Sequence, residues 1–209
     1  MPTFTKAELS EALHELGQFC VEAGKIIDIA NYEGSCLILV SNFRFSSDDA
    51  DAVASEDQAF VDDASRKIAT RHAWPEDWLN DGVRTYLSSA VEGRQAHELF
   101  ATYPDESNPG LRVYVPTPEY MLAMKLMALR IGPTGGKDLE DIVNLLQIVG
   151  LESKAKIVEF AARFYPEARI SGKLRLALDD LWNNYQARIV SPPDEPPKYL
   201  GRSRRPPQR

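Results

Sequence analysis

The stretch SSDDADAVA, at residues 46–54, governs the interpretation of the whole chain. Its polar start is followed by Asp49 to Ala54, which predicts a short strand. Residues i and i+2 of a strand point to the same face, so the carboxylates of Asp49 and Asp51 would project together. Two like charges so close repel each other, and a hard divalent cation such as Mg²⁺ or Mn²⁺ removes that conflict. The alternative is a solvated acidic loop, because further aspartates stand nearby at positions 48, 57, 62 and 63.

The composition describes a chain that can fold around one core. Its 209 residues are 44% hydrophobic and 26% charged, which suffices for a sizeable core with a helical appendage. The net charge of −7 argues against a broad basic face for duplex nucleic acid. Cys20 and Cys36 stand in apolar contexts without a CxxC motif, which favours buried thiols over a disulfide or a zinc site. We see no signal peptide and no apolar run of roughly 20 residues, so we expect a cytoplasmic protein that does not enter a membrane.

Upstream of the acidic stretch, the pattern predicts a helix, a strand and an apolar block. Apolar residues recur at helical spacing between Thr5 and Ala23, with Thr5 as the N-cap and Glu8 three residues later. Gly24 is expected to end this helix. After it come a strand at 26–30, a turn at 31–35 and an apolar block at 36–40 that is either a buried helix or a buried strand.

Downstream, two further strands are expected before the chain becomes wholly helical. A proline turn at Trp74-Pro75 is expected to open a helix that includes Trp78 to Asp81. Thr117 as N-cap and Pro118 at the first helical position predict a helix that runs to about Arg130. The remaining expected elements are a helix at 57–72, strands at 97–103 and 111–115, and helices at 137–149, 153–164 and 171–187.

These elements together predict an α+β fold, with a small mixed sheet packed with helices and a helical C-terminal portion after it. We divide the chain into an α/β core at 1–116, a helical portion at 117–189 and a tail at 190–209. The tail is rich in proline and arginine, and we expect it to be disordered or wrapped around a partner. The histidines, at positions 14, 72 and 97, are too scattered to predict a metal site or a catalytic triad.

Several motifs follow one another in the order found in one known superfamily. Gly34-Ser35 comes after the first predicted strand, the acid pair comes a little more than ten residues later, and a helix around Lys125 precedes KDLED at 137–141. Together they resemble the small bacterial version of the nucleotidyltransferase fold of the DNA polymerase beta superfamily, and in particular the abortive-infection toxins of type IV toxin–antitoxin systems. The segment Trp78 to Asp81 resembles one in a related uncharacterised bacterial family. The resemblance covers roughly residues 9–164.

The resemblance implies a nucleotidyltransferase-like core and a Mg²⁺-dependent transfer of a nucleotide from an NTP. The acceptor would be a tRNA 3′ end or a protein hydroxyl, and the chain would be the toxin partner of a cognate antitoxin. The residues it assigns are Asp49 and Asp51 for the metal, Gly34 and Ser35 for the phosphates, Lys125 and Arg130 as cations near the phosphates, and Asp138 or Asp141 to orient Lys125 or the nucleotide.

Three departures from the family pattern keep a second hypothesis open. Glu33 occupies a place where the family often has a glycine, and its charge would repel phosphate. The family's Arg-Asp pair appears as Lys137-Asp138 after a Gly-rich insert, and the strand at 111–115 lacks the third carboxylate of many active members. The second hypothesis is therefore a non-catalytic binding module of the same fold.

Some of the assigned residues also have purely structural interpretations. Gly34-Ser35 can be an ordinary turn, and Lys125 can extend from an apolar helix to the surface. Asp138 can serve only as a favourable acid at a helix N-terminus.

Overall fold

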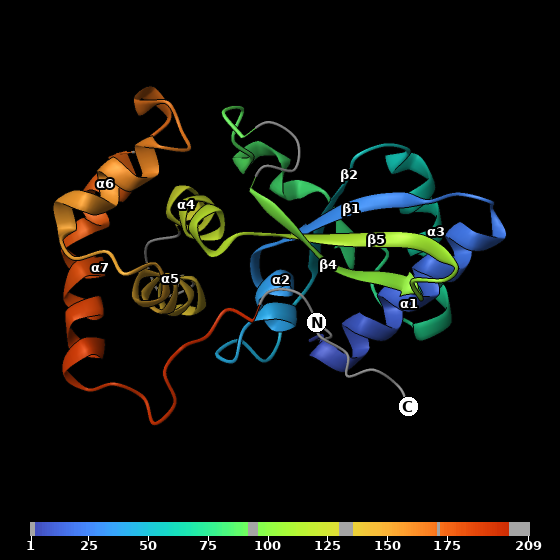
Figure 1. The fold of residues 1–209 in the computed structure, drawn as a ribbon, viewed down its shortest axis with the longest axis horizontal. Helices are drawn as coiled ribbons and strands as arrows, with labels where there is room; N and C mark the ends of the chain where they lie inside the picture. Colours follow the sequence, from blue (N-terminus) through green and yellow to red (C-terminus); the bar gives the residue numbers. More distant parts are fainter. Residues whose placement is uncertain (1–2, 92–95, 130–135, 171, 201–209) are drawn as a thin grey trace. The chain divides into compact units, whose positions relative to one another are not determined.

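The computed structural model describes residues 3–91, 96–129, 136–170 and 172–200. These residues form a mixed α+β structure with a five-stranded sheet and seven α-helices (Figure 1). The α+β class expected from the sequence is therefore confirmed. Two compact units are present: one combines Met1–Thr85, His97–Pro116 and Leu200, and the other combines Tyr86–Ala96 and Thr117–Tyr199.

The sheet of the first unit has the strand order β3-β2-β1-β5-β4 and mixed strand directions. The central strand β1 runs antiparallel to β2 and parallel to β5, while β2 is parallel to β3 and β4 is antiparallel to β5. The four longer strands lie where the sequence predicted strands, and only the two-residue β3 was not expected. The strands are β1 (Ile27–Tyr32), β2 (Ala50–Ala54), β3 (Leu79–Asn80), β4 (His97–Pro104) and β5 (Pro109–Pro116).

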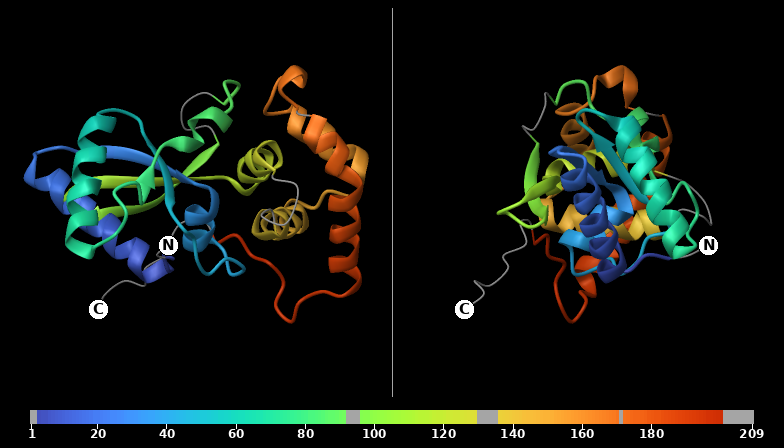
Figure 2. Two further views of the ribbon diagram at one scale, coloured as in Figure 1. Left: turned by 180° about the vertical axis from the view of Figure 1, so that it is seen from behind. Right: turned by 90° about the vertical axis from the view of Figure 1, so that its right-hand side faces the viewer.

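Helix α1 covers one face of this sheet and contacts the other two α-helices of the unit (Figure 2). It approaches β4 so closely that a Cβ added at Gly17 would lie 2.7 Å from the Cβ of Tyr103, so glycine is required there. Tyr103 pairs with Leu111 of β5, which is fully buried on the same face. The helices of this unit are α1 (Lys6–Glu22), α2 (Glu33–Val40) and α3 (Gln58–His72).

The start of α1 confirms the predicted capping box. The Thr5 side chain accepts a hydrogen bond from the Glu8 N–H, and the Glu8 carboxylate accepts one from the Thr5 N–H at 2.8 Å. Past the helix, Gly24 has a φ of 65°, the left-handed conformation that often ends a helix.

The opposite face of the sheet, away from α1, carries polar side chains. On β5, Val113 is fully buried towards α1, and its neighbours Arg112 and Tyr114 therefore point to the other face. Tyr114 pairs with Ala30 of β1, and Tyr32, two residues further along, pairs with Asp51 of β2. Asp51 thus lies on the polar face.

The turn expected at residues 31–35 does not form. Strand β1 continues to Tyr32, and α2 starts immediately at Glu33, so the apolar block at 36–40 is a buried helix. Glu33 achieves the abrupt change of direction with a φ of 53°, in the left-handed region. A positive φ at Glu33 alone replaces the longer turn that the sequence predicts.

The helix expected to open near Trp74 is also absent, because burial of the Trp78 side chain determines the backbone conformation of this segment. The Trp78 ring is buried, and its Nε1–H donates to the Ser65 carbonyl of α3 at 3.0 Å. The Ala50 N–H donates to the Trp78 carbonyl at 2.7 Å, which aligns the next two residues with β2 as strand β3. A short 3₁₀ helix, Gly82–Tyr86, follows.

The second unit is helical, as expected for the chain after residue 117. Thr117 caps α4 by accepting from the Tyr120 N–H, and Pro118 occupies its first turn. The described residues 86–91 and Ala96 also belong to this unit, where the Ser88 N–H donates to the Tyr120 hydroxyl at 2.9 Å. The helices are α4 (Pro118–Ala128), α5 (Gly136–Val149), α6 (Lys154–Ala162) and α7 (Gly172–Val190), with a 3₁₀ turn at Glu167–Arg169.

The end of the chain is described as far as Leu200. Residues 191–200 form no helix, and the Leu200 N–H donates to the carbonyl of Val40 at the end of α2, at 2.5 Å. The rest of the tail, at 201–209, and the site residue Arg130 lie outside the described residues.

Candidate functional site

The start of α2 lies against the loop that precedes β2. A Cβ added at Gly34 would lie 2.6 Å from Ser47 Oγ and 3.1 Å from Arg44 Nη2, so only glycine allows the loop to approach this closely. The first N–H groups of a helix lack helical partners and favour anions. Gly34 is buried, and the start of α2 has a guanidinium beside it, a combination of positive charges that favours an anion such as phosphate.

The Ser35 hydroxyl forms its hydrogen bonds inside the first unit. Its side chain has no exposed surface, and Oγ lies within donating distance of Asn31 Oδ1 at 2.7 Å and the Tyr32 carbonyl at 2.9 Å. The Asp51 N–H donates to the same Oγ at 3.2 Å. Ser35 thus joins the start of α2 to both β1 and β2, and in this geometry its side chain serves the fold.

The two carboxylates lie at the start of β2. The buried residues of the strand alternate with Asp51 and Val53, and Asp49 stands two residues before Asp51, just outside the strand. Asp49 is exposed and Asp51 is half-buried. Because Asp51 is tied to Ser35, the carboxylate pair and the start of α2 are neighbours in space. Their oxygen donors are of the kind that Mg²⁺ prefers.

Lys125 forms a charged cluster with the two acids predicted to orient it, entirely within the second unit. Its Nζ lies 3.0 Å from Asp138 Oδ1 and 3.1 Å from Asp141 Oδ2. Lys125 and Asp141 each expose only 2% of the side chain, so the lysine does not extend to the surface. The cluster joins α4 to α5, and a buried charge needs such partners to be tolerated. Its acids belong to a different unit from Asp49 and Asp51.

The strand that lacks the family's third carboxylate presents a basic residue, Arg112. On the polar face of β5, Arg112 Nε donates to Asp28 Oδ1 of β1 at 2.5 Å. Asp28 is 6% exposed, and it pairs with Arg112 across the parallel strands. An ion pair between a buried aspartate and a partly exposed arginine therefore occupies the central part of the polar face.

Sequence reasoning missed three residues that the topology brings to the same part of the first unit. Arg44, in the loop after α2, brings its guanidinium beside Gly34 at the start of that helix, and Asn80 lies opposite Asp51, with its Nδ2 donating to Asp49 Oδ2 at 3.4 Å. His97, which seemed isolated, has its Nε2 2.9 Å from the Tyr32 hydroxyl. Only Asn80 carried a sequence signal, since it stands in the segment that resembles a bacterial family.

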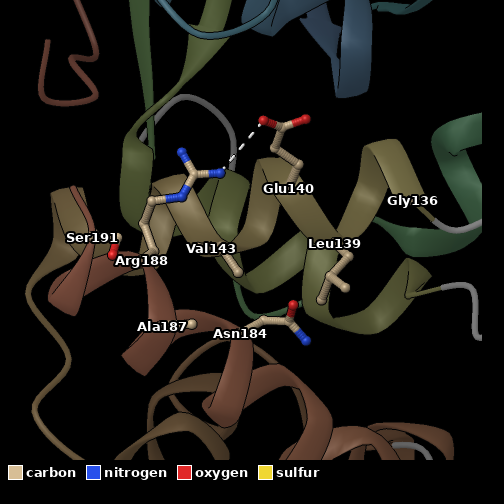
Figure 3. Close-up of a pocket in the computed structure, with 8 residues that line it drawn as sticks. All are labelled: Gly136, Leu139, Glu140, Val143, Asn184, Ala187, Arg188 and Ser191. Atoms are coloured by element: carbon tan, nitrogen blue, oxygen red, sulfur yellow. Dashed lines mark hydrogen bonds and ion pairs between the residues drawn. The ribbon is translucent and has the colours of Figure 1, made fainter. Parts of the chain in front are cut away.

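A cavity of about 380 Å³ lies within the second unit, between α5 and α7 (Figure 3). At its rim, Arg188 Nη2 lies 3.5 Å from Glu140 Oε1, a loose pair between partly exposed side chains. None of the predicted site residues is among those that line it: Gly136, Leu139, Glu140, Val143, Asn184, Ala187, Arg188 and Ser191.

Comparison of the chain with models of protein families, with curated proteins and with solved structures finds no match. Within the described parts of the chain, no group of three or more His, Cys, Asp or Glu side chains is arranged to hold a metal ion. A metal at the start of β2 would thus take two carboxylates from the protein and its other ligands from the substrate or water. None of the described helices is both long and apolar enough to span a membrane.

Proposed function

We propose that this protein is a Mg²⁺-dependent nucleotidyltransferase of the DNA polymerase beta type, which moves a nucleotide from an NTP to a tRNA 3′ end or a protein hydroxyl. The observation that carries the proposal is the hydrogen bond from the Asp51 N–H to Ser35 Oγ. It sets the acid pair beside the helix start at Gly34, so a triphosphate could contact both groups at once.

Each group at this end of the first unit has a task in the proposal. Asp49 and Asp51 would hold Mg²⁺, which supplies positive charge against the triphosphate. The N–H groups at the start of α2 bind phosphate oxygens, and the Arg44 guanidinium adds a fixed cation. These groups stabilise the charge that develops as the α-phosphate is transferred and pyrophosphate leaves. The phosphate role of Lys125 remains a prediction, and so does the role of the chain as a toxin with a cognate antitoxin.

The test of the proposal is label transfer. Incubation with each labelled NTP and Mg²⁺, with total tRNA or with the protein itself as acceptor, should give labelled product. Asp51→Asn should abolish the product because the site loses a charged metal ligand. Asp179→Asn, which removes an exposed carboxylate on α7, is the control and should retain it. Labelling that persists in Asp51→Asn would exclude the proposed site.

A second candidate, a non-catalytic binding module with the same fold, is favoured by two observations. Glu33 places a carboxylate at the helix start, with its Oε1 buried, and β5 carries Arg112 in place of an acid. Nucleotide binding without transfer to any acceptor would support this candidate, and transfer abolished by Asp51→Asn would reject it.

A further inference from the structure

The segment from Trp78 to Gly82 lies alongside the acid pair. Strand β3 pairs in parallel with β2, with Leu79 opposite Ala50 and Asn80 opposite Asp51. The buried Trp78 ring, bonded to α3, anchors the segment. Because Trp78 and β3 are fixed by the core, the Asn80 side chain projects from a rigid position beside Asp51.

The hydrogen bonds of Asn80 define which way its amide faces. Its Oδ1 accepts from the Gly82 N–H at 2.9 Å, so that atom must be the oxygen and the Nδ2 must face the other way. The Nδ2 then donates to Asp49 Oδ2 at 3.4 Å. A Cβ at Gly82 would lie 3.0 Å from Asn80 Oδ1, so a larger residue there would press on the amide.

This arrangement can orient one carboxylate without neutralising it. Asp49 precedes the strand and is exposed, and the Asn80 amide limits the directions in which its side chain can point. A carboxylate has about four lone-pair positions, and one amide donor occupies a single one of them.

We infer that Asn80 is a positioning residue that holds the Asp49 carboxylate beside Asp51 for a divalent cation. The inference rests on the proposed function, because it assigns the cation to the same pair of acids. Partners that orient metal ligands typically account for a 10- to 100-fold change in metal affinity. A neutral amide suits the task, since a lysine would compete with the cation and an acid would add repulsion.

The first test detects the contact without any metal. The side-chain N–H₂ signals of Asn80 are followed by ¹⁵N–¹H NMR in the parent and in Asp49→Ala. We expect them to shift in Asp49→Ala and to stay in place in Asp48→Ala, which removes the adjacent exposed acid. Unchanged Asn80 signals in Asp49→Ala would overturn the inference, whatever the protein binds.

The second test measures Mn²⁺ alone, by the paramagnetic broadening of the Ala50 and Ala52 amide signals. Asn80→Ala should weaken Mn²⁺ binding by about 10-fold. Asn108→Ala, the same change at an exposed turn residue, should bind as the parent does. Equal affinity in Asn80→Ala and the parent would overturn the positioning role alone. A parent that binds no Mn²⁺, even with ATP added, would overturn the proposed function and the inference together.

Discussion

Glu33→Gly should both stabilise the protein and strengthen its binding of nucleotide. Glu33 has a φ of 53°, a conformation that costs a residue with a Cβ about 1–2 kcal/mol. Glycine removes that cost but loses about 0.5–1 kcal/mol more to the entropy of the unfolded chain. The net gain is roughly 0.5–1 kcal/mol, which raises the Tm by about 1–4 °C in a chain of this size.

The effect on binding has a separate physical origin. Glu33 is the first residue of α2, next to Gly34, where the proposal places a phosphate. A like charge about 4 Å away costs about 1 kcal/mol even in a medium as polar as water, so its removal should tighten NTP·Mg²⁺ binding about fivefold. Calorimetric titration measures the affinity, and thermal unfolding measures the Tm.

Two control variants separate the effect of backbone strain at Glu33 from the effect of its carboxylate charge. Glu33→Gln removes the charge and keeps the strained backbone, so it should tighten binding with no gain in Tm. Ala73→Gly relieves a φ of 54° at the exposed C-cap of α3, so it should raise the Tm and leave binding unchanged. If Ala73→Gly raises the Tm and Glu33→Gly does not, the argument from strain is refuted. If Glu33→Gln leaves the affinity unchanged, the carboxylate does not face the phosphates.

Three further predictions concern single residues. Gly34→Ala should lower the free energy of unfolding in urea by about 1–3 kcal/mol, because the new Cβ would lie 2.6 Å from Ser47 Oγ. Gly136→Ala is the control: its Cβ would meet nothing within 4 Å, so it should not destabilise the protein. Lys125→Met should cost about 3–5 kcal/mol by the same assay, because it removes the cation that lies 3.1 Å from the buried Asp141 carboxylate. The double variant Lys125→Met/Asp141→Leu should recover much of this loss. A Lys125→Met variant as stable as the parent would contradict the buried pair. Burial raises the pKa of the Cys20 thiol to about 11, so its contribution to stability is complete below about pH 9 and is lost as the pH rises towards 11. Mass spectrometry should therefore find Cys20 unalkylated in the native protein at pH 8 and alkylated in urea; rapid native alkylation would show that the thiol is accessible.

The local signals in the sequence specified most of the secondary structure. Periodicity and capping residues located α1 and α4, because Thr5 and Thr117 interact with backbone groups only three residues away. The strand that contains Asp51 was also predictable, since its buried alanines alternate with Asp51 and Val53 at a period of two. These features depend on neighbours along the chain, which a sequence displays directly.

The errors occurred where tertiary contacts overrode local pattern. Glu33 adopts a left-handed φ because β1 and α2 meet without a loop, and propensity would have predicted glycine there. The residues around Trp78 form a strand because the indole is buried under α3, 13 residues away in sequence from its partner Ser65. Neither constraint is visible until the sheet is assembled.

The sequence proposes the acids of the candidate site and reveals little of the residues around them. The spacing of Asp49 and Asp51 predicted a metal site, which stays a prediction. The family resemblance predicted that Asp138 or Asp141 would orient Lys125 or the nucleotide, and both acids lie within 3.1 Å of the lysine Nζ. The proximity of Arg44, Asn80 and His97 to the site arises from loop packing and strand register. Such contacts join residues from separate elements, so spacing in the sequence does not reveal them.

The central claim is that Asp49 and Asp51 together bind a metal–nucleotide complex, and calorimetry tests it most directly. The parent protein and the Asp49→Asn/Asp51→Asn variant are each titrated with the four NTPs in the presence of Mg²⁺, with Asp179→Asn/Asp180→Asn as a charge-matched control on α7. We predict that the parent and the control bind at least one NTP with the same affinity and that the variant loses this binding. Equal binding by the Asp49→Asn/Asp51→Asn variant and the parent would contradict the claim.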